Sequence, residues 1–353
     1  MANRASNIVT ISNAAASVSV DALGGAIIDF HLHAGNINPL SFKLPLDKMP
    51  ENNRSGAVYQ GHFACIGRWG QPSAGEVEAG LPNHGQAANL PWTVHSLTEN
   101  ELHMEVNAPL DGLHTSRVLA LDKTSPVFTV TERVKNINPL NRLYNIVQHP
   151  TIAAPFLDEH TLVNCNAAAG FSCFGDDDLQ HISAWPKGIC EDGKTLDLSN
   201  PHKGDGFSVF AFVVDEDSDI GWLTAWSPTH NLVFGYVWDR FDYPWINLWQ
   251  DYADGKLKNR GLEFGTTGIH KPFHEILQSG HINVLGEKTI NYIDAGAEIE
   301  RSYCAFLINV PGDFKGVEAL NLVEGNILIK PNKSREMINL STNYKIMHNG
   351  FQK

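Results

Sequence analysis

The chain has 353 residues, of which 42% are hydrophobic and 18% are charged, a composition typical of a globular protein with a sizeable core. Its net charge of −13, from 26 Lys and Arg against 39 Asp and Glu, argues against nucleic acid or an anionic membrane as a partner. The sequence contains no run of 18 apolar residues and no apolar N-terminal segment of the kind that signal peptides carry. We therefore expect a cytoplasmic protein without a transmembrane helix.

The cysteines are odd in number, five, and none are spaced as Cys-X-X-Cys. This pattern predicts reduced and mostly buried thiols rather than a disulfide framework or a zinc site. We expect neither a metal nor another cofactor. The acidic run Asp176–Asp178 is interpreted as a solvated turn, with a bound divalent ion as the alternative.

The N-terminal part of the chain alternates between apolar and polar residues, which predicts strands at 8–12, 17–20 and 26–33 with a turn at Gly24-Gly25. Residues 36–60 are polar and contain three prolines, so we expect an excursion or a lid. Residues 61–92 are predicted to form a long loop region.

Further short strands, separated by Asn, Asp, Gly or Pro, are predicted to follow in quick succession. They are expected at 92–97, 101–106, 113–121, 127–134, 143–150, 207–214, 220–226, 232–236, 243–252, 261–266, 288–292 and 302–308. Residues 155–205 are predicted to be mostly loops, and 313–322 is the one candidate for a short helix. The expectation is a single all-β domain over 1–353, a large antiparallel β-sandwich with few short helices.

The segment 80–92 has the residue types of a binding loop. Pro82 and Pro91 fix the backbone near its ends, and Gly85 permits a close approach to a ligand. Between them lie the imidazole of His84 and three amide side chains, those of Asn83, Gln86 and Asn89. No helix or strand period fits this segment, so we predict a loop at the mouth of a concave site. The alternative is a surface loop whose histidine is merely exposed.

Three polar clusters lie at strand ends or on loops, where side chains can converge on one cleft without disturbing a core. These clusters are Arg68 with His84, Gln148 with His149, and Asp251 with Glu263. Glu263 lies between Leu262 and Phe264, so strand alternation places its carboxylate on the opposite face from two large apolar side chains. A structural role for His149 and a solvated face for Glu263 are the alternatives.

Taken together, these segments resemble the aldose 1-epimerases, or galactose mutarotases. Residues 80–86, Gly-Leu-Pro-Asn-His-Gly-Gln, with Arg68 upstream, resemble the arginine and Gly-Leu-His-Gly segment of that family. Residues 144–150, Tyr-Asn-Ile-Val-Gln-His-Pro, resemble its strand ending in a catalytic His-Pro, and 261–266, Gly-Leu-Glu-Phe-Gly-Thr, resemble its Leu-Glu-Pro segment. The three segments occur in family order, and the similarity extends over roughly residues 7–310.

The resemblance implies a β-supersandwich and an enzyme that interconverts the anomers of a sugar without a cofactor. By this similarity Glu263 is the general base for the anomeric hydroxyl, and His149 is the general acid for the ring oxygen. His84 and Arg68 bind and polarise the sugar. A carboxylate and an imidazole suffice for opening a hemiacetal, because the reaction removes one proton and delivers another.

Gln148 and Asp251 are further candidate substrate contacts. Trp249, with its neighbours Trp245 and Tyr252, is a candidate for stacking on a pyranose, and burial in the core is the alternative for these aromatic rings.

The sequence also departs from the family pattern in the parts that contact the sugar. Thr151 follows His149-Pro150, Gly67 replaces an asparagine before the arginine, and Phe264 replaces a proline. The substrate aspartate has no clear counterpart, with Asp239 and Asp251 as candidates. Three other functions therefore stay open: a catalytically silent sugar-binding sandwich, a hexose-6-phosphate mutarotase, and a polysaccharide lyase or hydrolase, the lyase using Tyr144 with His149.

Overall fold

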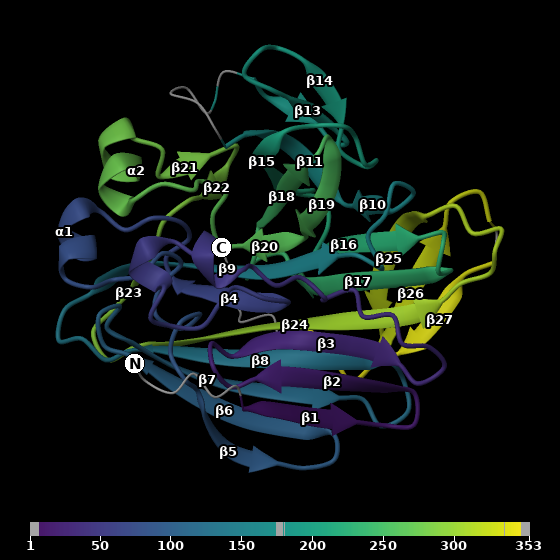
Figure 1. Ribbon diagram of the computed structural model, residues 1–353, viewed down its shortest axis with the longest axis horizontal. Helices are drawn as coiled ribbons and strands as arrows, with labels where there is room; N and C mark the ends of the chain where they lie inside the picture. The colour runs from purple at the N-terminus through teal and green to yellow at the C-terminus, as the bar shows by residue number, and fades with distance from the viewer. Residues whose placement is uncertain (1–6, 174–178, 180, 335, 347–353) are drawn as a thin grey trace.

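The computed structural model describes residues 7–173, 179, 181–334 and 336–346, and in these residues two large antiparallel sheets pack face to face (Figure 1). The first sheet contains, in spatial order, β1 (Ile8–Ser12), β2 (Ala16–Asp21), β3 (Ala26–Leu32), β4 (His62–Gly67), β9 (Arg142–Ala153), β19 (Lys256–Gly261), β18 (Trp245–Ala253), β15 (Gly206–Val214), β11 (Ala167–Ser172) and β12 (Ser183–Ala184). β20 (Glu263–Gly265) joins β18 and β9, and β23 (Asn291–Ile293) joins β9.

The second sheet has the order β10 (Leu162–Cys165), β16 (Ile220–Ser227), β17 (Leu232–Asp239), β24 (Glu298–Asn309), β8 (Val127–Asn136), β7 (Leu113–Leu121), β6 (Glu101–Ala108) and β5 (Thr93–Leu97). Smaller sheets are formed by β13 (Lys187–Ile189) with β14 (Thr195–Asp197), by β21 (Asn283–Val284) with β22 (Glu287–Lys288), and by β25 (Val317–Val323), β26 (Asn326–Pro331) and β27 (Ile338–Ser341). The helices of the described chain are short: α1 (Ala74–Glu78), α2 (Phe273–Ser279) and two 3-10 turns at Leu46–Lys48 and Glu51–Asn53.

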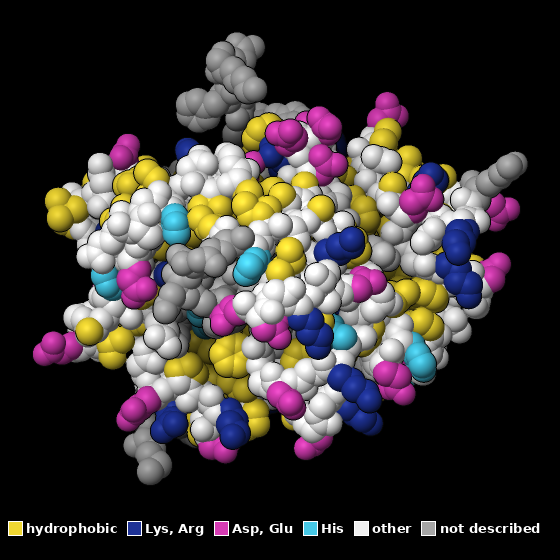
Figure 2. All heavy atoms as spheres, turned by 90° about the horizontal axis from the view of Figure 1, so that it is seen from above, with side chains coloured by type: hydrophobic (Ala, Val, Ile, Leu, Met, Phe, Trp, Pro, Cys, Tyr) yellow, Lys and Arg dark blue, Asp and Glu magenta, His cyan; other side chains and the backbone are white. Residues whose placement is uncertain are grey.

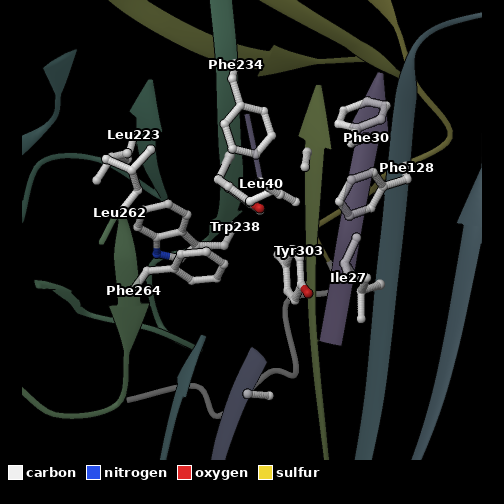
Figure 3. Packing of buried hydrophobic residues seen from close by; sticks show 14 of the residues in the cluster. Ile27, Phe30, Leu40, Phe128, Leu223, Phe234, Trp238, Leu262, Phe264 and Tyr303 are labelled. Atoms are coloured by element: carbon white, nitrogen blue, oxygen red, sulfur yellow. The ribbon is translucent and has the colours of Figure 1, made fainter. Parts of the chain in front are cut away.

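The main core lies between the two large sheets and is built largely from aromatic rings (Figure 3). Phe264 of the first sheet stacks on Trp238 of the second, with ring centroids 4.3 Å apart. Phe30 and Phe128 meet edge to face at 5.0 Å. Because neighbouring residues of a strand point to opposite faces, the direction of Phe264 into this core fixes the direction of Glu263 away from it.

A third layer, the sheet β25–β27, covers the outer face of β16 and β17 (Figure 1). Its side chains pack with Trp222, Trp226 and Val233 of those two strands. For this reason β16 and β17 are buried on both faces, and their sequences are almost continuously apolar.

The predicted all-β sandwich is confirmed, as are most strands up to residue 309. Two predictions about local structure were wrong. Residues 62–67 form the strand β4 within the supposed long loop, because both faces of this strand are buried and it therefore lacks polar alternation. Residues 317–323 form the strand β25 rather than part of a helix, since the pairing with β26 outweighs the weak local helical preference.

The described part of 155–205 consists mostly of loops, as predicted, with the five short strands β10–β14 between them. The Asp176–Asp178 run lies outside the described residues. Four of the five cysteines, Cys65, Cys165, Cys173 and Cys304, are buried. In the described parts of the chain, the helices are too short to cross a membrane.

Candidate functional site

The face of the first sheet that points away from the second is covered by loops, and a cavity of about 190 Å³ lies beneath them. This volume is below the roughly 300–1,000 Å³ of pockets for drug-sized ligands, which favours a small ligand. The cavity is lined by Phe42, Leu44, Tyr59, Phe63, Trp69, His84, His149, Phe207, Val209, Trp249, Glu263 and His270.

Strand pairing brings Glu263 and His149 together. β20 pairs with β9 so that Phe264 lies opposite Gln148, and continuing this register by one residue places Glu263 opposite His149. The imidazole Nε2 of His149 lies 3.2 Å from a carboxylate oxygen of Glu263. The two groups therefore touch side by side, rather than facing each other across a gap that a sugar ring would span.

The carboxyl group of Glu263 is fully buried at the cavity wall. Neither oxygen has a hydrogen bond of good geometry to another described residue. Burial is the main influence on its pKa, which is raised well above the usual value, although the nearby Trp69 indole favours the charged form to a smaller extent. A buried carboxyl with so few polar neighbours is costly for the fold, and such sites are typical of catalytic carboxyls.

His149 lies in an equally dry environment. Its ring stacks on Phe63, with centroids 4.3 Å apart, and its Nδ1 lies 3.2 Å from the Thr151 hydroxyl. Burial, together with the smaller effect of the neighbouring His270, lowers the pKa of His149 to about 3. Because one group favours its protonated form and the other its neutral form, the pair with Glu263 holds a single proton in the empty cavity.

The loop 80–92 presents His84 to this pair. His84 has a left-handed backbone with φ of 62°, which is uncommon for a residue other than glycine. Two hydrogen bonds hold it there: its backbone N–H donates to the Gly70 carbonyl, and its Nδ1 accepts from the Gly70 N–H. Since Nδ1 is an acceptor, neutral His84 carries its proton on Nε2, which makes Nε2 a donor. Burial, with His270 and His149 nearby, keeps the pKa of His84 well below its usual value.

The amide side chains of this loop support it. Gln86 accepts from the backbone N–H of Leu110, and Asn89 donates to the carbonyl of Gly85. Gly85 has φ of 78°, and a Cβ at this position would lie 2.3 Å from the carbonyl oxygen of Ile66. Only glycine fits here, so the loop passes directly over β4 and brings His84 to the cavity.

Two residues that the sequence did not indicate also belong to the cavity, His270 and Trp69. The His270 ring lies 5.7 Å from that of His84 and meets Trp69 edge to face at 4.8 Å. Burial lowers the pKa of His270 to about 4, so it is neutral near pH 7. The segment around His270 carries no sequence motif. Trp69 could have been predicted, because it is adjacent to Arg68 and neighbouring residues of an extended segment point to opposite faces.

Arg68 does not line the cavity. Its guanidinium donates two hydrogen bonds to Glu76, of 2.8 and 2.9 Å, and lies over the ring of Phe273. Although burial alone would raise the pKa of Glu76, the hydrogen bonds from Arg68 and Ser73 lower it to about 2. The structure therefore gives Arg68 a role in holding α1, away from the sugar-binding position implied by the resemblance.

Arg68→Met is expected to lower the free energy of unfolding by about 2 kcal/mol, because a buried charged hydrogen-bonding group is lost. For the sugar epimerisation that the resemblance implies, kcat/KM should stay within about threefold of wild type. Arg133→Met, in an exposed pair with Glu300, is the matched control and should cost less than about 1 kcal/mol. Chemical denaturation measures the stability of each variant, and a rate assay measures its kcat/KM. A large rise in KM for Arg68→Met with unchanged stability would contradict the structural role and support Arg68 as a sugar ligand.

The other predicted residues divide between the cavity and its surroundings. Trp249 lines the cavity, 5.8 Å from Phe42 between ring centroids. Asp251 lies outside the lining, where it accepts a hydrogen bond from Asn259. Gln148 points into the core between the sheets and donates to Glu132.

Tyr144 is also part of the core between the sheets. It is five residues from His149 on β9, an odd number, and so points to the opposite face. A tyrosine–histidine pair of these two residues, as a lyase would need, is not formed. Trp245 and Tyr252 are buried, as the alternative interpretation of these aromatics predicted.

Glu263 is the one acidic side chain among the described residues that line the cavity. Among the described residues that line the cavity there is no Lys or Arg. On the face shown in Figure 2, acidic and basic side chains are interspersed rather than gathered by sign. Within the described chain, no group of three or more His, Cys, Asp or Glu side chains is arranged to hold a metal ion.

No protein-family model matches the sequence, and no curated protein matches it either. Among solved structures, a proposed aldose 1-epimerase from Klebsiella pneumoniae aligns with a TM-score of 0.62 and 16% identity, over 86% of this chain and 80% of that one. A proposed aldose 1-epimerase from Escherichia coli K12 aligns with a TM-score of 0.60 and 14% identity, over 87% and 100%. A galactose mutarotase related enzyme from Lactobacillus acidophilus aligns with a TM-score of 0.59 and 11% identity, over 86% of this chain and 98% of that one.

The chain has the galactose mutarotase-like fold. The resemblance drawn from three short segments is thus confirmed at the level of the fold. The low identities agree with a divergent sequence, and at such identities the likeness extends to the fold alone.

Proposed function

We propose that the protein is an aldose 1-epimerase, an isomerase that interconverts the α and β anomers of a free sugar. The observation that carries this proposal is the buried pair of Glu263 and His149 in an aromatic cavity on the galactose mutarotase-like fold. The two oxygens that exchange protons in a cyclic hemiacetal are bonded to the same carbon. An acid and a base that serve them must lie close together, as these two do.

In the proposed reaction the pair is in the form with ionised Glu263 and protonated His149 when the closed sugar reacts. Glu263 takes the proton of the C1 hydroxyl while His149 gives its proton to the ring oxygen. The C1–ring oxygen bond breaks, the C1 oxygen becomes a carbonyl, and the ring oxygen becomes a hydroxyl. Rotation about C1–C2 and reversal of both transfers close the other anomer, so no proton is gained or lost overall.

The cavity stabilises the open-chain state of this cycle. After ring opening, Glu263 is protonated and His149 is neutral, which is the form that burial favours for both groups. His84 presents its Nε2–H to the cavity and is placed to donate to a sugar oxygen as charge develops there. The aromatic walls exclude water, which strengthens both interactions.

The cavity favours a neutral sugar over the sugar phosphate that the sequence left open. A phosphate is held by clustered Arg or Lys side chains, and the described lining contains neither. Arg68, which precedes the lining residue Trp69 in the sequence, is already paired with Glu76.

Polarimetry tests the proposal. Freshly dissolved α-D-glucose, α-D-galactose and their 6-phosphates are mixed with the protein, and the decay of optical rotation is compared with the spontaneous rate. Acceleration with at least one aldose is expected. Sugar binding without acceleration for any aldose would contradict the enzyme and support the silent sugar-binding sandwich.

The pH profile provides a separate prediction. The single-proton form of the pair is lost when a second proton binds, and burial depresses the pKa of His149 to about 3. From pH 7 downwards, kcat/KM should therefore stay flat to about pH 5 and fall only between about pH 4 and 3, as His270 and then His149 become protonated, whereas an ordinary histidine would give a fall near pH 6.5. The rate is measured after subtraction of the spontaneous reaction, with circular dichroism in the same buffers showing that the protein is folded. An acid limb centred near pH 6.5 would contradict the buried pair as the catalyst.

A further inference from the structure

The cavity offers few hydrogen-bonding groups for the number of hydroxyls on a hexose. The described lining side chains that carry a hydrogen-bonding group are those of Tyr59, Trp69, His84, His149, Trp249, Glu263 and His270, and the Trp69 indole is directed to Glu263. His149 and Glu263 are committed to C1 and the ring oxygen in the proposed reaction. His84 has only Nε2 left, because its Nδ1 accepts from the Gly70 N–H.

Polar groups near the cavity are directed elsewhere. The Tyr59 hydroxyl donates to the Asn83 carbonyl and accepts from the Asn53 amide. Gln148 is turned into the core, and Arg68 is bonded to Glu76. None of these groups is free to turn towards a sugar without breaking a buried hydrogen bond.

The remaining wall is apolar. Phe42, Phe63 and Trp249 present aromatic surface, Val209 adds an aliphatic patch, and Phe207 extends the surface to the solvent, where its side chain is 60% exposed. Aromatic rings pack well on the C–H faces of a pyranose, but apart from the Trp249 indole N–H this wall gives no partner to a hydroxyl at the edge of the sugar.

We propose that the substrates of this site are deoxy aldoses, neutral sugars in which one or more ring or C6 hydroxyls are replaced by hydrogen. This inference rests on the proposed function. A hexopyranose carries four hydroxyls besides the anomeric one, and His84, His270 and the Trp249 indole N–H together provide partners for about three. Each further hydroxyl would lose its hydrogen bonds to water on entering the cavity, whereas a C–H group at the same position would gain contact with the aromatic wall.

The test compares each parent sugar with its deoxy counterparts by polarimetry: D-galactose with 6-deoxy-D-galactose, and D-glucose with 2-deoxy- and 6-deoxy-D-glucose. We expect kcat/KM to be at least tenfold higher for one deoxy sugar than for its parent. Calorimetric titration of the same sugars onto Glu263→Gln measures the binding preference separately from turnover.

Two variants examine the cause of the preference. Val209→Thr places a hydroxyl in the apolar wall at nearly constant volume and should narrow the ratio of deoxy to parent kcat/KM at least threefold. Val213→Thr, the same change on the same face of β15 but outside the cavity lining, should leave the ratio unchanged.

The outcomes separate the two proposals. If no sugar in the panel is turned over faster than spontaneously, the proposed activity fails, and the titration alone then decides the deoxy preference. If glucose and galactose react and bind as well as all their deoxy counterparts, the epimerase stands and this inference is overturned. An unchanged ratio in Val209→Thr would also overturn it, because the preference would not come from missing hydrogen-bond partners.

Discussion

Glu263→Gln is expected to lower the enzymatic rate of mutarotation by about 10²–10⁴-fold while leaving the protein folded. The amide keeps the shape of the carboxyl but cannot accept the proton of the C1 hydroxyl. Sugar binding should persist, because the aromatic walls and His84 are unchanged. Polarimetry and calorimetric titration of the same preparation separate these two effects.

The same substitution should make the protein more stable near neutral pH. Burial raises the pKa of Glu263 in the folded state above its unfolded value, so the folded protein holds the proton more tightly. The resulting contribution to the free energy of unfolding is fully present below about pH 4.3, the pKa of a glutamate in the unfolded chain. It is lost as the pH rises through the pKa of Glu263 in the folded protein. The Glu263→Gln variant would not undergo this loss, and its melting temperature at pH 7–8 should be equal to or higher than that of wild type.

Asp251→Asn is the matched control for Glu263→Gln. It makes the same chemical change in the first sheet, at a carboxylate outside the cavity lining that bonds Asn259. Its rate should lie within about threefold of wild type. A Glu263→Gln variant that retains the wild-type rate, or an Asp251→Asn variant that loses it, would contradict the assignment of the base.

Phe264→Ala is expected to give the largest loss of stability, about 3–5 kcal/mol in the free energy of unfolding. The ring is fully buried, stacks on Trp238 and meets Tyr236, Tyr243 and Tyr303 at centroid distances of 5.2–5.4 Å. Removing it leaves a cavity between the two sheets that this packed core cannot close (Figure 3). Chemical denaturation followed by tryptophan fluorescence measures the loss.

Phe264 also connects the core to the site, since it follows Glu263 on the three-residue strand β20. We therefore expect Phe264→Ala to lower kcat even at temperatures where the variant is fully folded. Phe241→Ala is the control: its ring is 69% exposed, and the substitution should change stability by no more than about 0.5 kcal/mol. A loss for Phe264→Ala as small as that of the control would show that the two sheets do not depend on this contact.

The face on which Glu263 lies could be predicted from three residues. Leu262 and Phe264 are large and apolar, so a strand must turn them inwards and turn Glu263 the other way. The same period applied to β9 separates Gln148 from His149, although both were predicted as site residues. This alternation alone excludes Gln148 from the face that carries His149. Gln148 was predicted as a site residue because it precedes the His-Pro motif.

For the loop 80–92, the local sequence predicts the backbone conformation but not the roles of the individual side chains. Its prolines and Gly85 indicate a fixed, irregular backbone, and the structure has one. The sequence does not reveal that the amides hold the loop while His84 alone faces the cavity, because that depends on which groups of β4 and of 107–112 lie beneath it.

By itself the sequence determined the all-β class, most strands up to residue 309, and the carboxyl and imidazole that meet at 3.2 Å. Only the tertiary structure decided that Arg68 is bonded to Glu76, that His270 and Trp69 complete the cavity, and that β25–β27 form a third layer. The physical reason is that a strand's period of two fixes the face on which a side chain lies. What covers that face, and therefore the apolarity of the cavity, is set by packing between segments far apart in the chain.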